Sequence, residues 1–159
     1  IGVPQVAATV DCAAARDFFY KRTGKYVPII TDGGMITSGD ICKAFACGAD
    51  AVMVGSAFVR ANEAPAKGYH WGMATSDENL PRGTRIRLGT TGPVKQILFG
   101  PSNTDDGSQN LIGALRLSMA SLGASNIREL QLVEIAIAPA IKTEGKIYQV
   151  AKKQAMIGK

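Results

Sequence analysis

The nine residues YVPIITDGG, numbered 26–34, decide the fold of this 159-residue chain. An apolar run rich in β-branched side chains ends abruptly in an acidic residue and two glycines. Its apolar residues do not alternate with polar ones, which is typical of a parallel strand that is covered on both faces. We therefore expect a buried strand over residues 26–31, followed by a tight turn at Gly33 and Gly34.

Helices are expected on both sides of this strand. Residues 5–22 are dominated by Ala, Val and Phe, with Pro4 near the first turn and Gly24 after the last. Proline before a helix and glycine after it are typical boundaries, because the first needs no N–H and the second adopts positive φ. Beyond the strand, Ser38 is the expected N-cap of a helix over residues 41–46.

A second strand repeats the pattern of the first. Gly48 ends the second helix, and the apolar residues 51–54 lead into Gly55 and Ser56. Residues 57–62 then begin a further helical stretch. Strands that alternate with helices through short turns predict an α/β fold with a parallel sheet, either a doubly wound fold or a (β/α)8 TIM barrel.

The rest of the chain is less regular. Glycines and prolines punctuate residues 63–107, which we interpret as a loop-rich flap. The remaining expected segments are a short strand over residues 85–88, an exposed turn over residues 103–108, a helix over residues 110–122, a strand over residues 132–137 and a tail over residues 139–159. We expect residues 1–138 to belong to one domain, extended at its C-terminal end by this last helix and strand.

Composition restricts the class of protein. The chain is 46% hydrophobic and 19% charged, which is typical of a globular domain. No apolar run is long enough to span a membrane, and the first residues are not typical of a signal peptide, so no membrane partner is expected. The cysteines, which suggest no disulfide framework, favour a reducing cytoplasm. The net charge is +5, but no basic stripe alternates with aromatic residues, so nucleic acid is not an expected partner. The start of the chain is typical of the middle of a longer protein.

The three cysteines, Cys12, Cys42 and Cys47, suggest no special chemistry. Their number is odd and no two of them are separated by two residues, so neither a disulfide framework nor a metal site is expected. We interpret all three as small buried hydrophobic residues, rather than as nucleophiles.

The two strand ends predict a binding site. Glycine lets backbone N–H groups approach a ligand closely. Gly33 and Gly34 after one strand, with Gly55 and Ser56 after the next, are therefore expected to enclose a phosphate group, as the last loops of (β/α)8 barrels commonly do. Asp32 would lie beside a ribose and accept hydrogen bonds from its hydroxyls. The alternatives are that the glycines serve only the turns and that Asp32 caps a helix.

These stretches resemble the IMP dehydrogenase/GMP reductase family, and within it the IMP dehydrogenase-related branch of cyanobacteria and actinobacteria. The matching stretches are GVPQ at residues 2–5, ITDGGM at 30–35, SGDI at 38–41, GADAVMVGS at 48–56, EAP at 63–65, GPVK at 92–95 and LIGALR at 111–116. The resemblance covers residues 1 to about 138 and implies the C-terminal part of a TIM barrel.

The resemblance also implies roles for individual residues. Asp32 would bind the ribose, while Gly33, Gly34, Gly55 and Ser56 would hold the 5′-phosphate. The family's Tyr-Arg-Gly-Met-Gly segment corresponds to residues 70–74. This correspondence makes four further residues candidates for substrate binding: His70, Gly72, Met73 and Ala74. His70 would contact the phosphate in place of a tyrosine; a general base and a plain surface histidine are the alternatives.

The chain departs from the family pattern in several places. The family's catalytic cysteine lies in a Gly-Ser-x-Cys loop upstream of residue 1, so no catalytic residue is expected in this chain. The Arg-Tyr pair that activates water in dehydrogenases is missing between Gly72 and Pro81, and Arg82 stands where relatives place Glu or Gln. The stretch from Gly100 to Gln109 is an unusual insertion.

The family implies an NAD-dependent oxidoreductase that converts IMP to XMP in GMP biosynthesis, with this chain binding the purine nucleotide. The alternatives are a GMP reductase that uses NADPH and a non-catalytic nucleotide-binding module. IMP, XMP or GMP would be the small-molecule partner. The family further implies a homotetramer and a possible monovalent cation, while the residues that bind the cofactor are unknown. We expect the isolated chain to be inactive and to associate, because an open barrel exposes strand edges.

Overall fold

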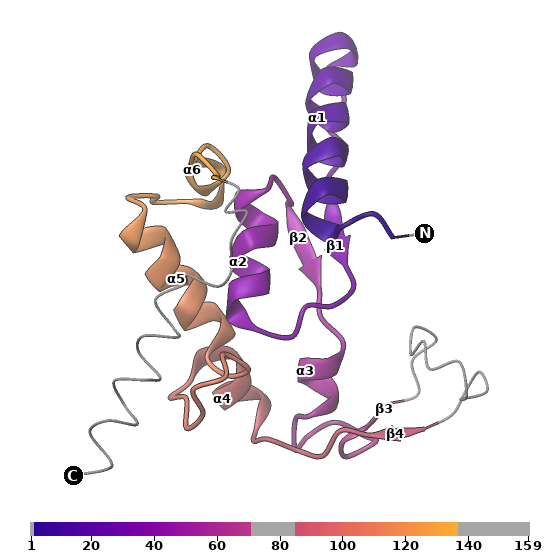
Figure 1. The fold of residues 1–159 in the computed structure, drawn as a ribbon, viewed down its shortest axis with the longest axis vertical. Coiled ribbons are helices and arrows are strands. Elements are labelled where there is room, and N and C mark those ends of the chain that lie inside the picture. The colour runs from indigo at the N-terminus through magenta and orange to yellow at the C-terminus, as the bar shows by residue number, and fades with distance from the viewer. Residues whose placement is uncertain (1, 71–84, 137–159) are drawn as a thin grey trace.

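The computed structural model describes residues 2–70 and 85–136. Its elements are, in order, α1 (Gln5–Thr23), β1 (Ile30–Asp32), α2 (Ser38–Ala46), β2 (Ala51–Met53), α3 (Ser56–Val59), β3 (Tyr69–His70), β4 (Ile86–Arg87), α4 (Val94–Phe99), α5 (Leu111–Ser121) and α6 (Ile127–Leu130) (Figure 1). The first five elements alternate between helix and strand. The predicted α/β class is therefore confirmed.

The strands β1 and β2 pair in parallel, with Thr31 opposite Val52 and Asp32 opposite Met53. Both are shorter than the sequence predicts, since β1 begins only at Ile30. The preceding residues do not form the predicted ladder, because Pro28 has no N–H to donate. Ile29 instead accepts hydrogen bonds from the backbone of Asp50 and Ala51, which aligns the start of β2.

The prediction that both faces of the strands are covered is wrong for the described residues. Thr31 is buried, whereas Ile30 and Met53 are about half exposed, at 55% and 53%. Successive side chains of a strand point to opposite faces. Ile30, Asp32 and Met53 therefore share one open face, while α1 and α2 lie against the other (Figure 1).

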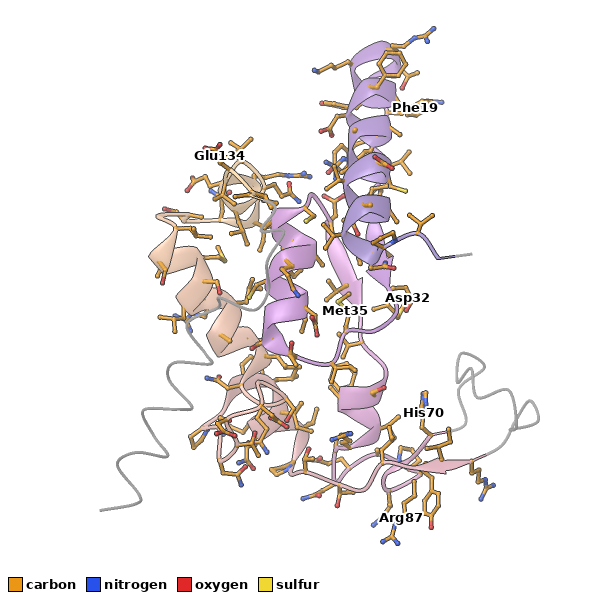
Figure 2. The ribbon with its side chains drawn as sticks, in the orientation of Figure 1. Phe19, Asp32, Met35, His70, Arg87 and Glu134 are labelled. Carbon is orange, nitrogen blue, oxygen red and sulfur yellow. The ribbon has the colours of Figure 1, made fainter. Side chains whose placement is uncertain are left out.

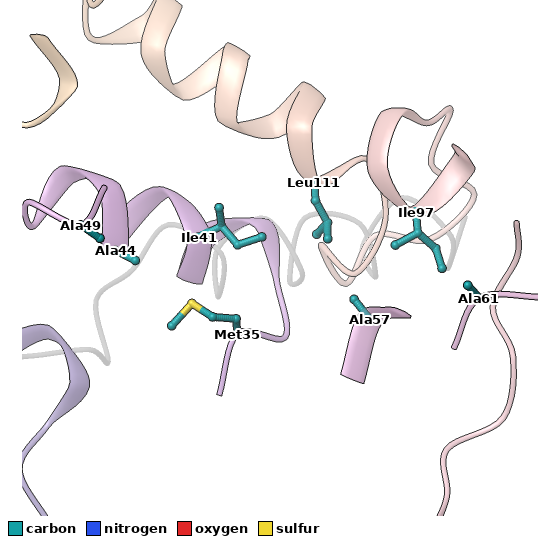
Figure 3. Packing of buried hydrophobic residues seen from close by; sticks show 8 residues of the cluster. All are labelled: Met35, Ile41, Ala44, Ala49, Ala57, Ala61, Ile97 and Leu111. Carbon is teal, nitrogen blue, oxygen red and sulfur yellow. The ribbon is translucent and has the colours of Figure 1, made fainter. Parts of the chain in front are cut away.

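The helix α2 lies at the centre of the hydrophobic core. Its apolar side chains meet those of the loop after β1 and of α3, α4 and α5 (Figure 3). The fully buried members of this core include Ile97 in α4 and Leu111 in α5. A second, smaller cluster of Leu115, Ala124 and Leu130 packs α5 and α6 against the other side of α2. The core thus fixes the position of both loops that follow β1 and β2.

Local signals explain the ends of α2. Thr37, rather than the predicted Ser38, is its N-cap: the Thr37 side chain accepts from the Asp40 backbone while Asp40 accepts from the Thr37 backbone, a capping box. The helix ends at Ala46, and Gly48 follows with φ of 103°. A Cβ at Gly48 would lie only 2.6 Å from the Cβ of Ala13, so glycine is needed there for α1 to approach.

The helix α1 follows the prediction closely, with Gly24 in the left-handed conformation at its C-cap. It is attached by a buried hydrogen bond of 2.9 Å between the hydroxyls of Thr9 and Thr31. Most of its surface is exposed, and its C-terminal half projects beyond the other elements (Figure 1). Cys12 is therefore exposed, and the prediction that it is buried is wrong; Cys47 is buried and Cys42 is half-buried.

The prediction is less accurate beyond residue 60. The helix α3 ends at Val59, because Ala61 forms a parallel bridge with Gly92. The predicted short strand is confirmed at its centre as β4, which pairs antiparallel with β3. The predicted exposed turn is present, and there Ser108 and Thr104 donate to Asp106, lowering the pKa of that carboxyl group to about 2.

Two short helices were not predicted, and one predicted strand is wrong. The helix α4 begins directly after Pro93 inside the expected flap, and α6 begins at Asn126, whose side chain accepts from the Glu129 backbone. The helix predicted over residues 110–122 is confirmed as α5. Residues 132–136 form no strand, because the chain leaves α6 in a turn and finds no neighbouring strand among the described residues. Within residues 2–70 and 85–136, no helix is long and apolar enough to cross a membrane.

Candidate functional site

The carboxyl ends of β1 and β2 lie at the same edge of the sheet. Their parallel register places Asp32 opposite Met53, so the loops that follow the two strands leave side by side. Asp32 is exposed on the open face, and its side chain forms no hydrogen bond within the described chain (Figure 2). The carboxylate is therefore accessible to a ligand at the edge where sequence analysis placed one.

The glycines after β1 are required by the backbone. Gly33 and Gly34 have φ angles of 104° and 71°, which side chains rarely adopt. A Cβ added at either position would meet no atom within 4 Å, so the space beside their amides is open. Met35, the next residue, is buried in the core and anchors this turn (Figure 3).

Gly55 differs from these two glycines. Its φ is −105°, which any residue can adopt, and a Cβ there would also meet no atom within 4 Å. Neither backbone conformation nor packing within the described chain requires glycine at this position. Ser56 follows as the first residue of α3 and is half-buried.

The residues predicted to enclose the phosphate, which we call the cradle (Gly33, Gly34, Gly55 and Ser56), do not line a single pocket: the first two line one, Ser56 lines a second, and Gly55 is not among the described lining of either. Gly33 and Gly34 line an open pocket of about 260 Å³ together with Thr31 and the side chains of Asp40 and Lys43. Burial alone would raise the pKa of Asp40, but hydrogen bonds from Thr37 and the charge of Lys43 outweigh burial and lower it. The enclosure of one phosphate by both strand ends stays a prediction.

The second pocket, of about 130 Å³, is lined by Ser56 and Arg60 of α3, by Thr91 and by Ser108. Ile36, from the loop after β1, forms part of its wall. The insertion that contains Ser108 lies against the start of α2, because Ser38 donates its backbone N–H to the carbonyl of Gly107 at 2.8 Å. The insertion therefore forms a wall of the predicted site.

His70 ends β3, where it pairs with Ile86 of β4 and is half-buried. Figure 2 shows it beyond α3, well separated from Asp32 in this view. The other predicted purine contacts, Gly72, Met73 and Ala74, lie outside the described residues, as does Arg82.

An ion-pair network that was not predicted from the sequence lies at the opposite end of β2. Asp50 accepts hydrogen bonds from the Arg16 guanidinium at 2.8 Å, from the Tyr26 hydroxyl at 2.5 Å and from the backbone N–H of Ile29 at 2.8 Å. Arg128 of α6 also lies 3.1 Å from the Asp50 carboxylate. Asp50 thus joins α1, the segment before β1, β2 and α6.

The network keeps Asp50 ionised. Burial alone would raise its pKa, but the hydrogen bonds from Tyr26, Ile29 and Arg16 and the charge of Arg16 outweigh burial and lower it. The guanidinium groups of Arg16 and Arg128 also lie 5.2 Å and 4.8 Å from the centre of the Tyr26 ring. No short motif signals this network, since its partners come from four separate parts of the sequence.

The chain has an α/β fold, and glycines follow two neighbouring strands at one edge of its sheet. These features place it in the class of α/β proteins whose strand ends are candidate phosphate-binding sites. The family model described as the IMP dehydrogenase / GMP reductase domain matches residues 1–147. The chain belongs to this family.

The names of individual similar proteins are consistent with this family. An uncharacterized oxidoreductase from Mycolicibacterium smegmatis is 41% identical over 140 residues, covering 86% of this chain and 37% of the relative. An inosine-5′-monophosphate dehydrogenase from Aquifex aeolicus is 36% identical over 151 residues, and a GMP reductase from Leishmania donovani is 31% identical over 157 residues. Each of these two matches covers 82% of this chain and 29% of the relative.

A solved structure shows the same fold. The crystal structure of an IMP dehydrogenase/GMP reductase-like protein from Corynebacterium glutamicum matches with a TM-score of 0.77 and 39% sequence identity. The match covers 87% of this chain and 38% of that protein. The chain thus spans between 29% and 38% of the length of these relatives.

Proposed function

We propose that this chain is the nucleotide-binding part of a (β/α)8-barrel oxidoreductase that oxidises IMP to XMP with NAD⁺. Membership of the IMP dehydrogenase/GMP reductase family supports the reaction class. Two consecutive β/α units of a barrel are supported by the alternation of helix and strand from α1 to α3 and by the parallel pairing of β1 and β2. Because the chain corresponds to 37% of its relatives' length, it would supply only part of that barrel.

The observation that carries the proposal is the register of β1 and β2. It aligns the carboxyl ends of the two strands, so that the loops that carry the glycines leave from the same edge of the sheet as Asp32. A carboxylate can accept hydrogen bonds from two ribose hydroxyls, and open glycine amides can donate to a phosphate. Asp32 would bind the ribose, while Gly33, Gly34, Gly55 and Ser56 would bind the 5′-phosphate.

Gly55 gives this assignment independent support. Nothing within the described chain explains a glycine with ordinary backbone angles and open space at its Cβ position. A phosphate that approaches the backbone closely would explain it. By the same family correspondence, His70 would contact the phosphate, and Gly72, Met73 and Ala74 would contact the purine.

The chemistry would begin outside this chain. By analogy with the family, a cysteine thiolate preceding residue 1 attacks the purine at C2, and hydrolysis of the covalent intermediate releases XMP. Bound NAD⁺ supplies the hydride acceptor, and no described residue is assigned to it. The role of this chain is to orient the nucleotide, which can lower a barrier by several kcal/mol. Cys12, Cys42 and Cys47 take no catalytic part.

A GMP reductase is the second candidate. The missing Arg-Tyr pair favours it, since a reductase runs no hydrolysis step, and a GMP reductase is among the relatives. The branch resemblance favours the dehydrogenase. A cytoplasmic homotetramer and a monovalent-cation site are part of the proposal by family analogy.

A paired absorbance assay on the full-length protein tests the proposal. One cuvette contains IMP with NAD⁺ and the other GMP with NADPH. We expect NADH to appear only in the first. Loss of NADPH only in the second would establish the reductase instead. An unchanged absorbance in both cuvettes would favour a non-catalytic nucleotide-binding module.

A further inference from the structure

Arg60 has no ionic partner within the described chain. Among residues 2–70 and 85–136, Arg16, Lys43 and Arg128 form ion pairs, whereas Arg60 forms none. Asp106, which accepts from the lining residue Ser108, also accepts from Thr104 and forms no ion pair with Arg60. Arg60 is half-buried as a residue, and an arginine that lacks an ionic partner favours an added anion.

Arg60 lines a pocket of about 130 Å³ together with three residues that carry hydroxyl groups. Ser56 and Thr91 line it, and neither hydroxyl forms a hydrogen bond within the described chain, so both can donate. Ser108 also lines the pocket, but its hydroxyl donates to Asp106 at 2.6 Å and therefore presents a lone pair. None of the described lining residues is itself acidic, and the nearby Asp106 carboxylate accepts hydrogen bonds from Thr104 and Ser108.

The walls of the pocket are held together before any ligand binds. Thr91 donates its backbone N–H to the carbonyl of Arg60 at 2.9 Å. The Gln109 side chain donates to the carbonyl of Thr91 at 3.0 Å, which attaches the insertion to the segment that follows β4. Arg60, Thr91 and Ser108 are thus positioned by hydrogen bonds between three separate segments, and binding requires little rearrangement.

The size of the pocket restricts the ligand. Pockets for whole small molecules are about 300–1,000 Å³, so this one is too small for a nucleotide. It suits a single oxyanion group, and a guanidinium binds two phosphate oxygens in a fork. We propose that this pocket binds one phosphate group, with Arg60 as its charged ligand and with Ser56 and Thr91 as hydroxyl donors.

The phosphate has two possible sources, the 5′-phosphate of a purine nucleotide or free phosphate. The first rests on the proposed function and deepens it, because Ser56 would then join the pocket to the cradle. In that case Arg60 would add a full positive charge to a subsite otherwise built from backbone amides and hydroxyls. The second source would make the pocket a separate anion site.

The test compares four forms of the full-length protein: wild type, Arg60→Gln, Arg60→Lys and Arg87→Gln. Arg87 is an exposed arginine of β4 and provides the matched control. Inorganic phosphate is titrated into each form by calorimetry, after thermal melting has verified folding. We expect at least tenfold weaker phosphate binding in Arg60→Gln, an intermediate loss in Arg60→Lys and no change in Arg87→Gln. Equal affinity in wild type and Arg60→Gln, with both folded, overturns the inference.

Titration of IMP and inosine separates the two sources. If the 5′-phosphate occupies the pocket, inorganic phosphate competes with IMP, and Arg60→Gln loses most of the preference for IMP over inosine. If phosphate binding depends on Arg60 but IMP does not bind at all, the proposed function fails while the anion site stands. If IMP binds wild type and Arg60→Gln equally and phosphate binding is also unchanged, the proposed function stands and the anion site is overturned.

Discussion

The Arg16 guanidinium lies 2.8 Å from the Asp50 carboxylate, and the Arg16 side chain is only 4% exposed. Arg16 also donates to the carbonyl of Gly48 at 2.8 Å. The pair therefore attaches α1 to the start of β2. Removing one partner of a buried pair leaves an uncompensated charge, which typically destabilises a protein strongly.

Replacing Asp50 should destabilise the protein much more than replacing the other partner of Arg16. We expect Asp50→Asn to lower the free energy of unfolding of the full-length protein by about 3 kcal/mol. Asp17 also contacts Arg16, but its side chain is 56% exposed. Asp17→Asn should therefore cost less than about 1 kcal/mol. Denaturant unfolding of both variants measures the difference, and similar losses would contradict this role for Asp50.

The same network predicts a dependence of stability on pH. The pKa of Asp50 is lowered in the folded protein, so its stabilisation is present above the ordinary carboxyl pKa of about 4 and is lost as pH falls through the lower folded value. Wild type should therefore lose more stability than Asp50→Asn between pH 6 and the most acidic pH at which both fold. Parallel losses in denaturant titrations would show that Asp50 does not contribute to the acid response.

Gly55→Ala should separate stability from binding. Because Gly55 has ordinary backbone angles and open space at its Cβ position, the variant should melt within a few degrees of wild type. If a phosphate approaches this backbone, the added methyl group should weaken IMP binding at least tenfold. Gly123→Ala is the control, since Gly123 has φ of 71° and lies after α5, away from the site. It should lower stability modestly and leave IMP affinity unchanged.

The isolated chain should associate or aggregate and should show no turnover. Ile30 and Met53 lie exposed on the open face of the strand pair, and α1 carries exposed aromatic side chains, among them Phe18. Exposed apolar faces and strand edges favour association. Light scattering during size-exclusion chromatography checks the first expectation. A stable monomer that produces NADH from IMP would contradict both.

Sequence patterns predicted the helices and strands that carry local signals. Gly24 and Pro4 delimit α1, and the apolar runs before Asp32 and Gly55 place β1 and β2. The helix α4 was missed because the surrounding glycines and prolines suggested a loop, although Pro93 in front of it is a typical helix start.

The Asp50 network and the Arg60 pocket could not be predicted in the same way. Their partners are brought together by tertiary packing, as when Arg128 of α6 lies 3.1 Å from the Asp50 carboxylate. The candidate cradle was predictable because its glycines follow directly after strands. Its division between two pockets depends on Ile36 and on the insertion, which no local pattern positions.

Calorimetric titration of IMP into the full-length protein and its Asp32→Ala variant tests the central claim most directly. Asp32 is exposed and forms no hydrogen bond within the described chain, so the variant should fold as wild type does. Loss of two ribose hydrogen bonds to a carboxylate should weaken IMP binding roughly a hundredfold. An unchanged dissociation constant in a folded variant would contradict the account, because it would remove the ribose from the edge formed by β1 and β2.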